Sequence, residues 1–187
     1  MTGTSNKLRI AVLFGGRSAE HDVSILSATN VMKALDAARY EAVPVFVTRE
    51  GQWLLTRFTD GELARPSQGT EISLLPGGRG RAIAIPATGT PYELAKIDVV
   101  FPALHGLHGE DGSVQGLTEV ARVPLAGCGI CGAANALDKD IAKRLLREAG
   151  IPVARAVTIT RHAAPSFNEL KEALGLPIFI KPARQGS

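Results

Sequence analysis

The sequence predicts an α/β protein. Its N-terminal part is expected to have an open, mostly parallel, Rossmann-like sheet, followed by the beginning of an α+β unit. Apolar runs typical of buried strands, such as Leu8 to Phe14, alternate with helical apolar stripes, such as the one from Ile25 to Leu35. The first run also ends in Gly15-Gly16, and glycines there are typical of a tight strand-to-helix turn.

Further strands are expected after the first helix. Glu41 to Thr48 is interpreted as a strand, and Pro44 within it indicates an edge position. Gly51 to Thr56 is expected to pair with it as a hairpin. Residues 57–95 are rich in Gly, Pro and Thr and are interpreted as an elaborated surface excursion. This excursion contains two short strand-like pieces, 72–75 and 82–85.

The pattern then divides the chain into two units. Ile97 to Pro102 and Val123 to Ala126 read as the last strands of the first unit, so residues 1–137 are predicted to be one domain. Residues 138–187 are predicted to begin a second domain. Its expected elements are a helix capped by Asp138, a strand over Val153–Ile159, a helix with the capping box Ser166 and Glu169, and a strand starting at Ile178–Lys181.

Composition narrows the class of protein. Hydrophobic residues make up 45% of the 187 residues and charged residues 21%, which is typical of a globular protein with a core. The net charge is +3, the basic residues are scattered and aromatic residues are only 5%, which argues against a nucleic-acid partner. There is no apolar run as long as the roughly 18 residues of a membrane span, and no signal-peptide pattern. We therefore expect neither a nucleic-acid nor a membrane partner.

The two cysteines form a lone C-x-x-C, Cys128 and Cys131. Zinc would need a second pair of ligands at suitable spacing, and none is recognisable, so no metal site is predicted. A redox dithiol would lie at a helix N-terminus. Buried or idle free thiols are the preferred interpretation, and they indicate the reducing cytoplasm.

Glu20 is the first candidate site residue. It lies in the segment FGGRSAEHDVS, where glycines let a ligand approach the backbone and a helix N-terminus, capped by Ser18, offers N–H groups. Two interpretations stay open: Glu20 binds a ligand, or it only compensates the helix dipole. The segment lacks the G-x-G-x-x-G pattern, so a nicotinamide-dependent oxidoreductase is weakly supported.

His105 is the second candidate. It follows a buried strand and begins HGLHGEDG, which is dense in glycine, histidine and acidic residues for a connection. Parallel strands bring their carboxyl ends to one edge of a sheet, so Glu20 and His105 are expected to share a pocket there. The alternative is a capped turn, with Asp111 as the N-cap of the next helix.

Two lysines lie at positions where a positive charge is unfavourable unless an anion is bound nearby. Lys139 begins a helix, where it opposes the dipole, and Lys181 ends an apolar strand before a Gly/Ser loop. Together they suit a triphosphate at the junction of the two units, although each alone is compatible with a solvated lysine.

These segments resemble the D-alanine–D-alanine ligases of the ATP-grasp superfamily. Four segments, GGRSAEHDVS, FPALHGLHGEDGSVQG, ALDKDIAKRLLREAGIP and LGLPIFIKPARQGS, occur in family order over almost the whole chain. The resemblance implies that the first unit is the pre-ATP-grasp, substrate-binding domain and that the second is the beginning of the ATP-grasp domain.

The resemblance also implies roles. Glu20 would hold the ammonium of the first D-alanine, with His105 near its carboxylate; Lys139 and Lys181 would contact ATP phosphates. Ser187 matches a serine that orients the Glu20 carboxylate, which makes Glu20 and Ser187 the catalytic candidates. ATP would phosphorylate one D-alanine, and the amine of the second would attack the acyl phosphate to give a dipeptide for peptidoglycan synthesis.

The family continues beyond Ser187, so the ligands of Mg²⁺ (or Mn²⁺) and most of the adenine pocket are expected outside this chain. The 187 residues alone are expected to be inactive, and the full-length enzyme is expected to be a cytoplasmic homodimer. Two alternatives remain: a D-alanine–D-lactate ligase, and a non-catalytic amino-acid-binding α/β module.

Overall fold

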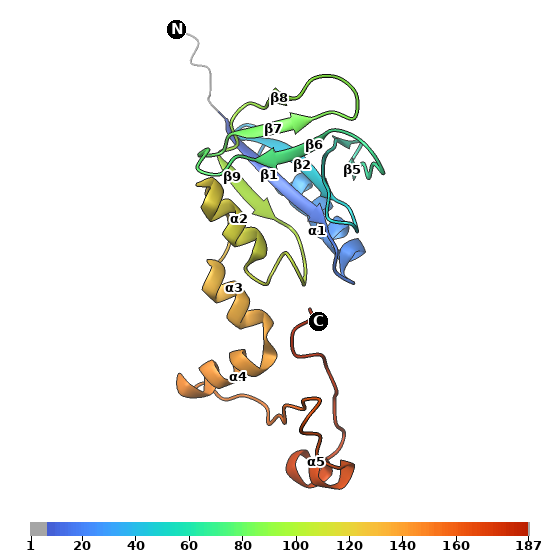
Figure 1. Cartoon of the computed structure of the whole chain (residues 1–187), viewed down its shortest axis with the longest axis vertical. Helices are drawn as coiled ribbons and strands as arrows, with labels where there is room; N and C mark the ends of the chain where they lie inside the picture. The colour runs from blue at the N-terminus through green and yellow to red at the C-terminus, as the bar shows by residue number, and fades with distance from the viewer. Residues whose placement is uncertain (1–6, 187) are drawn as a thin grey trace.

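The computed structural model describes residues 7–186, and its centre is a seven-stranded sheet (Figure 1). The strand order is β8-β7-β6-β3-β2-β1-β9. Three of these strands are parallel neighbours and carry the deepest core: β1 (Leu8–Gly15), β2 (Tyr40–Val47) and β9 (Val99–Pro102). The predicted α/β class is therefore confirmed, with the parallel strands together at the β9 end of the sheet.

The other strands of the sheet come from the excursion and are antiparallel. The first, β3 (Trp53–Leu55), pairs with β2 as the expected hairpin partner. The next strands are β6 (Glu71–Leu74), β7 (Ala82–Ile85) and β8 (Tyr92–Glu93), and a separate ribbon is formed by β4 (Phe58–Thr59) and β5 (Glu62–Leu63). Only one residue pair, Leu54 with Glu71, joins β3 to β6 in register. The excursion thus widens the sheet instead of only covering its surface.

Pro44 does not mark an edge, so that expectation is wrong. It is the register partner of Val12 in β1, and β3 pairs on the other side of β2. Proline is tolerated there because the β2–β3 pairing starts one residue later, at Val45 with Leu55, while the Pro44 carbonyl accepts a hydrogen bond from Thr56 N at 3.1 Å.

The two faces of the sheet pack against different helices. Val12 and Phe14 point to the face covered by Ala28 of α1 (His21–Ala34). Leu13 points to the other face, with Val114 of α2 (Ser113–Ala121). The alternation of side chains along β1 therefore fills two apolar layers, which fixes both helices relative to the same strand.

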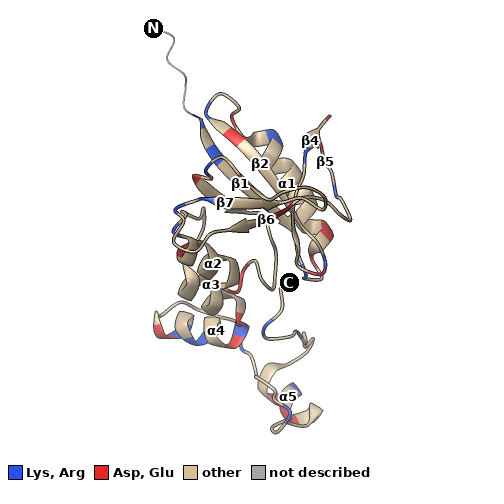
Figure 2. Ribbon diagram, turned by 45° about the horizontal axis from the view of Figure 1, so that its top comes forward, with Lys and Arg blue, Asp and Glu red and all other residues tan. Residues whose placement is uncertain are grey.

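Three more helices follow the sheet and extend away from it (Figure 1). They are α3 (Ile130–Leu137), α4 (Lys139–Glu148) and α5 (Phe167–Leu174). The predicted caps are present: the Asp138 carboxylate accepts from Asp140 N and Ile141 N at 3.0 and 3.1 Å, and Ser166 forms a capping box with Glu169. In Figure 2 the ribbon of α4 carries both basic and acidic positions.

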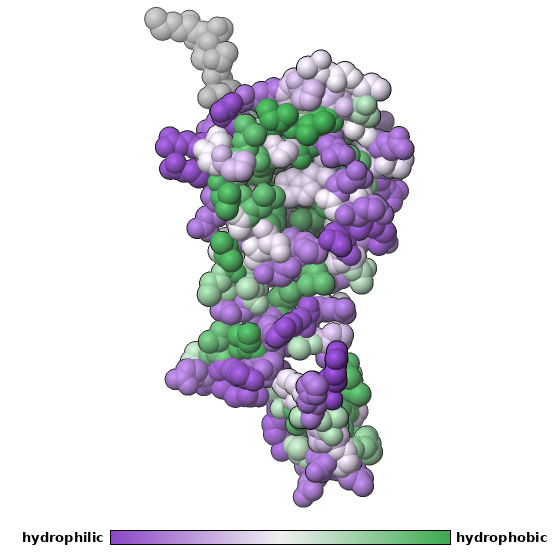
Figure 3. All heavy atoms as spheres, viewed as in Figure 1, coloured by the Kyte–Doolittle hydropathy of each residue, from purple (hydrophilic) through white to green (hydrophobic). Residues whose placement is uncertain are grey.

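Three predicted strands are wrong or reduced. Val153–Ile159 and Ile178–Lys181 are irregular and exposed, because no neighbouring strand within residues 7–186 pairs with them. Val123–Ala126 is reduced to a single bridge between Leu125 and Val100. No residue of α4 or α5 is buried, and Figure 3 shows hydrophobic atoms on the surface of this lower part.

Candidate ligand-binding site

The carboxyl ends of β1 and β9 form the edge at which the site residues gather. After β1 the chain turns into α1 and moves to β2 on one side, whereas β9 lies on the other side, so the strand order reverses at β1 and β9. Ligands of open α/β sheets bind at such a point. Gly15 and Gly16 form the turn with φ of 92° and 96°. A Cβ on Gly15 would lie 2.4 Å from the Val47 carbonyl oxygen, so only glycine fits.

Polar side chains of α1 hold both strand ends. The Ser24 hydroxyl donates to the Ala103 carbonyl at 2.6 Å and accepts from Gly15 N at 2.9 Å, fully buried. One turn earlier, His21 Nδ1 lies 2.6 Å from the Gly16 carbonyl oxygen. These polar side chains of α1 therefore connect the β1 turn to the loop after β9.

Ser27 of α1 adds a similar contact to His105 in the loop after β9. Its Nε2 shares a hydrogen bond of 2.9 Å with the Ser27 hydroxyl, and its Nδ1 lies 3.8 Å from Glu110 Oε1. Glu110 Oε2 accepts from Gly106 N at 2.7 Å, which folds the loop back beside His105. The imidazole is thus held from both sides and stays half-exposed at the sheet edge.

Glu20 lies at the same edge and is itself the N-cap residue of α1. Ser18, expected to cap the helix, instead accepts a hydrogen bond from Glu20 N at 3.1 Å. The Glu20 carboxylate lies against two backbone segments. A Cβ on Gly106 would be 3.0 Å from its Oε2, and a Cβ on Gly186 would be only 1.7 Å from it. Glu20 therefore lies beside the residue that follows His105.

The C-terminal segment reaches this edge by running along the start of α4. Ala183 O accepts from Lys139 N at 2.9 Å, and Lys139 Nζ donates to the carbonyls of Gln185 and Gly186. Arg184 Nε donates to Asp138 Oδ2 at 2.8 Å. Hydrogen bonds from Ile141 N and the Arg184 side chain lower the pKa of Asp138 below its ordinary value. Lys139 thus connects α4 to the C-terminal segment, whose Gly186 lies beside the Glu20 carboxylate.

The two remaining candidates are placed differently. Lys181 lies in exposed coil, and its side chain makes no hydrogen bond or ion pair within residues 7–186. Ser187 lies outside the described residues, directly after Gly186. The structure therefore brings Glu20, His105 and Lys139 together through the C-terminal segment, and does not add Lys181 to them.

The acidic loop after His105 also has a structural role. Burial would raise the pKa of Asp111, but hydrogen bonds from His108 N and Ser113 N, both 2.9 Å, lower it below its ordinary value. The N-cap of α2 is Gly112 and not Asp111, because Gly112 has a φ of 94°, which allows the sharp entry into the helix. Asp111 fixes the loop, and the helix starts after it.

Metal-binding chemistry has little support in the part of the chain that is described. Residues 7–186 contain no group of three or more His, Cys, Asp and Glu side chains placed to hold an ion. Cys128 and Cys131 are free and exposed, so of the expected buried or idle free thiols the buried alternative is wrong. They straddle the start of α3, and Cys131 Sγ accepts a hydrogen bond from Asn135 Nδ2 at 3.3 Å.

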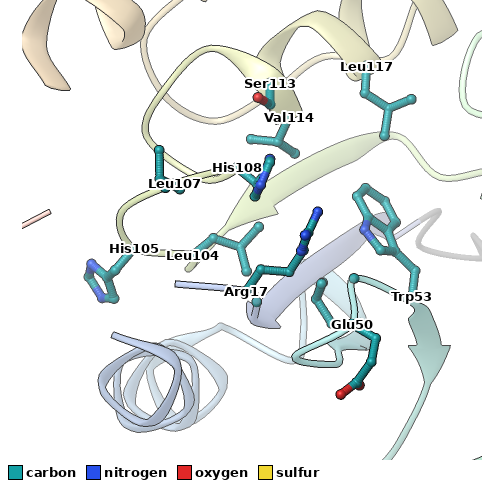
Figure 4. Close-up of a pocket in the computed structure, with 13 residues that line it drawn as sticks. Arg17, Glu50, Trp53, Leu104, His105, Leu107, His108, Ser113, Val114 and Leu117 are labelled. Carbon is teal, nitrogen blue, oxygen red and sulfur yellow. The ribbon is translucent and has the colours of Figure 1, made fainter. Parts of the chain in front are cut away.

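One feature of the site could not be found from the sequence. A hollow of about 260 Å³ lies next to the β1 turn and is lined by Arg17, Trp53, Leu104 and Val114, among others (Figure 4). Arg17, Leu104 and Val114 lie within two of the motif segments, GGRSAEHDVS and FPALHGLHGEDGSVQG, whereas Trp53 lies in none of them. Only the β2–β3 pairing brings Trp53 to this place, so the sequence does not identify the hollow as a whole.

The fold and the site define an open α/β ligand-binding domain with its polar residues at the carboxyl ends of the parallel strands. The family model described as "D-ala D-ala ligase N-terminus" matches residues 9–128, about two thirds of the chain. The chain therefore belongs to the D-alanine–D-alanine ligase family.

Individual relatives agree with this assignment. The D-alanine–D-alanine ligase A of Brucella suis biovar 1 (strain 1330) is 73% identical over 183 residues, which are 98% of this chain and 52% of that protein. The crystal structure of the VanG D-Ala:D-Ser ligase from Enterococcus faecalis has a TM-score of 0.74 at 32% identity and covers 97% of this chain and 53% of that one.

A third relative was solved with nucleotide. The D-alanine–D-alanine ligase from Bacillus anthracis complexed with ATP has a TM-score of 0.61 at 26% identity, covering 95% of this chain and 48% of that chain. The chain thus spans about half the length of the relatives it matches. No helix among residues 7–186 is long and apolar enough to cross a membrane.

Proposed function

We propose that this chain provides the substrate-binding half of an ATP-dependent D-alanine–D-alanine ligase. The observation that carries the proposal is the position of the Glu20 carboxylate, which lies against Gly106 beside His105 and against Gly186 at the other end of the chain. A fixed carboxylate and a fixed imidazole at one sheet edge suit the ammonium and the carboxylate of one amino acid.

In this proposal the residues take the roles that the family resemblance implies. Glu20 binds the ammonium of the first D-alanine and His105 its carboxylate, with Ser27 setting the direction of the imidazole. Ser187, adjacent to Gly186, orients the Glu20 carboxylate. The first D-alanine is activated as an acyl phosphate, and the amine of a second D-alanine displaces the phosphate. Phosphoryl transfer of this kind depends on positioning and charge more than on a protein nucleophile.

ATP binding involves the second unit. We assign residues 1–137 to the substrate-binding domain and 138–187 to the beginning of the ATP-grasp domain, in agreement with the confinement of the core to the first unit. Lys139 and Lys181 are the phosphate ligands of this proposal. Lys139 now donates to the carbonyls of Gln185 and Gly186, so nucleotide binding would exchange these contacts for phosphate oxygens. The ligands of Mg²⁺ or Mn²⁺ belong to residues beyond this chain.

The wider properties are part of the same proposal. The enzyme acts in the cytoplasm, where D-alanine and ATP are available, and as a homodimer at full length. Its product supplies peptidoglycan precursors for cell-wall biogenesis.

The test is phosphate release with ATP, Mg²⁺ and D-alanine, in a protein in which this chain is continued to the length of its relatives. Glu20→Gln should reduce turnover at least about 100-fold, because a charge-assisted bond to the ammonium is lost at the reacting molecule. Glu119→Gln, on the exposed side of α2, is the matched control and should retain activity. Equal activity of Glu20→Gln and wild type would refute the assignment.

The second substrate is tested in the same assay. D-lactate and D-serine are offered in place of the second D-alanine, and the products are separated by mass. Dipeptide as the main product supports the proposal, whereas a depsipeptide or a D-alanyl-D-serine product would assign a sister activity to the same Glu20 site.

A further inference from the structure

The hollow beside the β1 turn lies on the opposite face of the sheet from Glu20. Leu104 in its wall packs with Val114 in the α2 layer, whereas Ala103, one residue earlier, packs in the α1 layer. Glu20 does not line this hollow. His105 also lines the hollow, but Figure 4 shows its ring turned away toward α1, where Ser27 binds it. The Glu20 carboxylate and the hollow are therefore neighbouring features of one sheet edge, and His105 borders both.

The wall of the hollow is mostly apolar. Trp53 lies on one side, and Leu104, Val114 and Leu117 lie on the others. Leu117 is 43% exposed, although it stands on the face of α2 that borders the sheet. Apolar side chains left open in a concave site provide binding energy for an apolar ligand body.

The hollow is lined by one basic and one acidic side chain, Arg17 and Glu50, and only Arg17 points into it. Arg17 extends from the β1 turn and its Cδ lies against Gly51, where an added Cβ would be 3.0 Å away. No hydrogen bond or ion pair engages its guanidinium among residues 7–186. Figure 4 shows this group pointing into the hollow toward His108, and shows the carboxylate of Glu50, the one acidic residue of the lining, pointing out of it. An unpaired guanidinium over an apolar wall favours a carboxylate.

The size of the hollow limits the ligand. Its volume of about 260 Å³ lies at or below the lower end of the roughly 300–1,000 Å³ found for drug-sized ligands. A ligand of about ten heavy atoms is in keeping with this volume.

We propose that this hollow binds a small monocarboxylate with an apolar body, with the carboxylate on Arg17 and the body against Trp53, Leu104 and Leu117. Glu20 does not line this second site, and the proposal does not depend on the function proposed for Glu20. A ligand bound here contacts Leu104 and borders His105, which lines the hollow and also belongs to the D-alanine site proposed above.

Trp53 provides the measurement, because it is the one tryptophan of the chain and lines the hollow. The 187-residue chain is titrated with phenylacetate and followed by tryptophan fluorescence. The expected result is a saturable change, with at least ten-fold weaker binding of the neutral analogue phenylacetamide. Equal affinities for the two, or no saturation, would overturn the proposal. Displacement of phenylacetate by D-alanine would also overturn it, because the hollow would then belong to the D-alanine site.

Two pairs of variants locate the binding. Arg17→Gln should weaken phenylacetate at least ten-fold, whereas Arg65→Gln, an exposed arginine outside the hollow, should leave its affinity unchanged. Leu117→Glu places a carboxylate in the apolar wall and should abolish binding. Val120→Glu, on the same helix, 61% exposed and outside the hollow, should not affect it. Wild-type affinity of Leu117→Glu, or equal losses within either pair, would refute the site.

Discussion

Ser27 Oγ and His105 Nε2 lie 2.9 Å apart, although 78 residues separate them in the chain. The hydrogen bond joins the middle of α1 to the loop after β9 and leaves the other ring nitrogen facing Glu110. A neutral imidazole has one donor and one acceptor nitrogen, so the partner of one nitrogen determines what the other offers to a ligand.

Ser27→Ala should therefore disturb the orientation of His105 without changing the fold. In the enzyme continued to the length of its relatives, we expect KM for the first D-alanine to rise about five- to ten-fold, the scale of one hydrogen bond. Thr29→Ala is the control, because the Thr29 hydroxyl bonds only to Ile25 O in its own helix. A loss of kcat with unchanged KM would contradict a role of Ser27 in substrate positioning.

Ser24→Ala should destabilise the sheet unit itself. The substitution leaves Gly15 N and the Ala103 carbonyl without their buried partner, and each unsatisfied group costs about 1–3 kcal/mol. We expect a loss of about 2–4 kcal/mol in the free energy of unfolding, measured by urea denaturation with Trp53 fluorescence. Ser73→Ala, at an exposed position of β6, should change it by less than about 0.5 kcal/mol.

Gly186→Ala should move the Glu20 carboxylate. The added Cβ would lie 1.7 Å from Glu20 Oε2 and 3.3 Å from Gly106 Cα, so either the Glu20 side chain or the C-terminal segment must shift. Chemical-shift changes in the NMR spectrum should cover Glu20, Gly106 and residues 183–186. Gly129→Ala meets nothing within 4 Å and should change only its neighbours. A spectrum of Gly186→Ala with no change at Glu20 would show that the two segments are apart in solution.

The attachment of the C-terminal segment to α4 should depend on pH. The folded-state pKa of Asp138 is lowered, so the stabilisation it provides is complete above the ordinary pKa of 3.8 and is lost as the pH falls through the lower folded value. An NMR titration of the Asp138 carboxyl carbon and of Ile141 N–H should give a common midpoint below 3.8. In Asp138→Asn the Ile141 signal should no longer follow this midpoint. A midpoint above 3.8 would contradict the bonds from Ile141 and Arg184.

The isolated chain should self-associate through its second unit. Phe179 is 83% exposed and Ile180 88%, and the surface of α4 and α5 is also apolar in part (Figure 3). Exposed apolar patches of this kind promote association. In sedimentation experiments, replacing both residues by serine should reduce the associated fraction at a given concentration. Leu26→Ser, at an exposed leucine of α1, should reduce it less. Wild-type chain that stays monomeric at high concentration would contradict this prediction.

The sequence predicts the first parallel strand and the helix caps well, because each of these features has a strong local signal. The apolar run of β1, its glycine turn, and the caps Asp138 and Ser166 are all in place. The strand predicted at Ile178–Lys181 is wrong for a physical reason: an apolar run becomes a strand only beside a partner, and residues 7–186 offer none there.

The candidate site also contains residues that the sequence predicts and residues that it does not. Glu20 and His105 could be expected at one edge because parallel strands align their carboxyl ends. The part played by Ser24 and Ser27 could not, because serines in a helix normally indicate only a polar surface, and their partners are 79 and 78 residues away. The contacts of Lys139 with Gln185 and Gly186 likewise depend on how irregular chain folds back, for which the sequence has no periodic signal.

The single register pair between Leu54 and Glu71 has a consequence for how such proteins can diversify. Beyond β3 the ladder continues through one register pair, whereas β6 and β7 share four. The β6–β7 hairpin is also held outside the ladder, because Leu74 and Ala82 pack in the core and Gly77 N donates to the Val120 carbonyl of α2. The connection between β7 and β8 has no such contacts among the backbone hydrogen bonds of residues 7–186, so changes there should not affect the ladder between β1, β2 and β9. Grafting a tag or a binding peptide into residues 86–91, which connect β7 and β8 and are mostly exposed, should leave the glutamate–histidine edge intact.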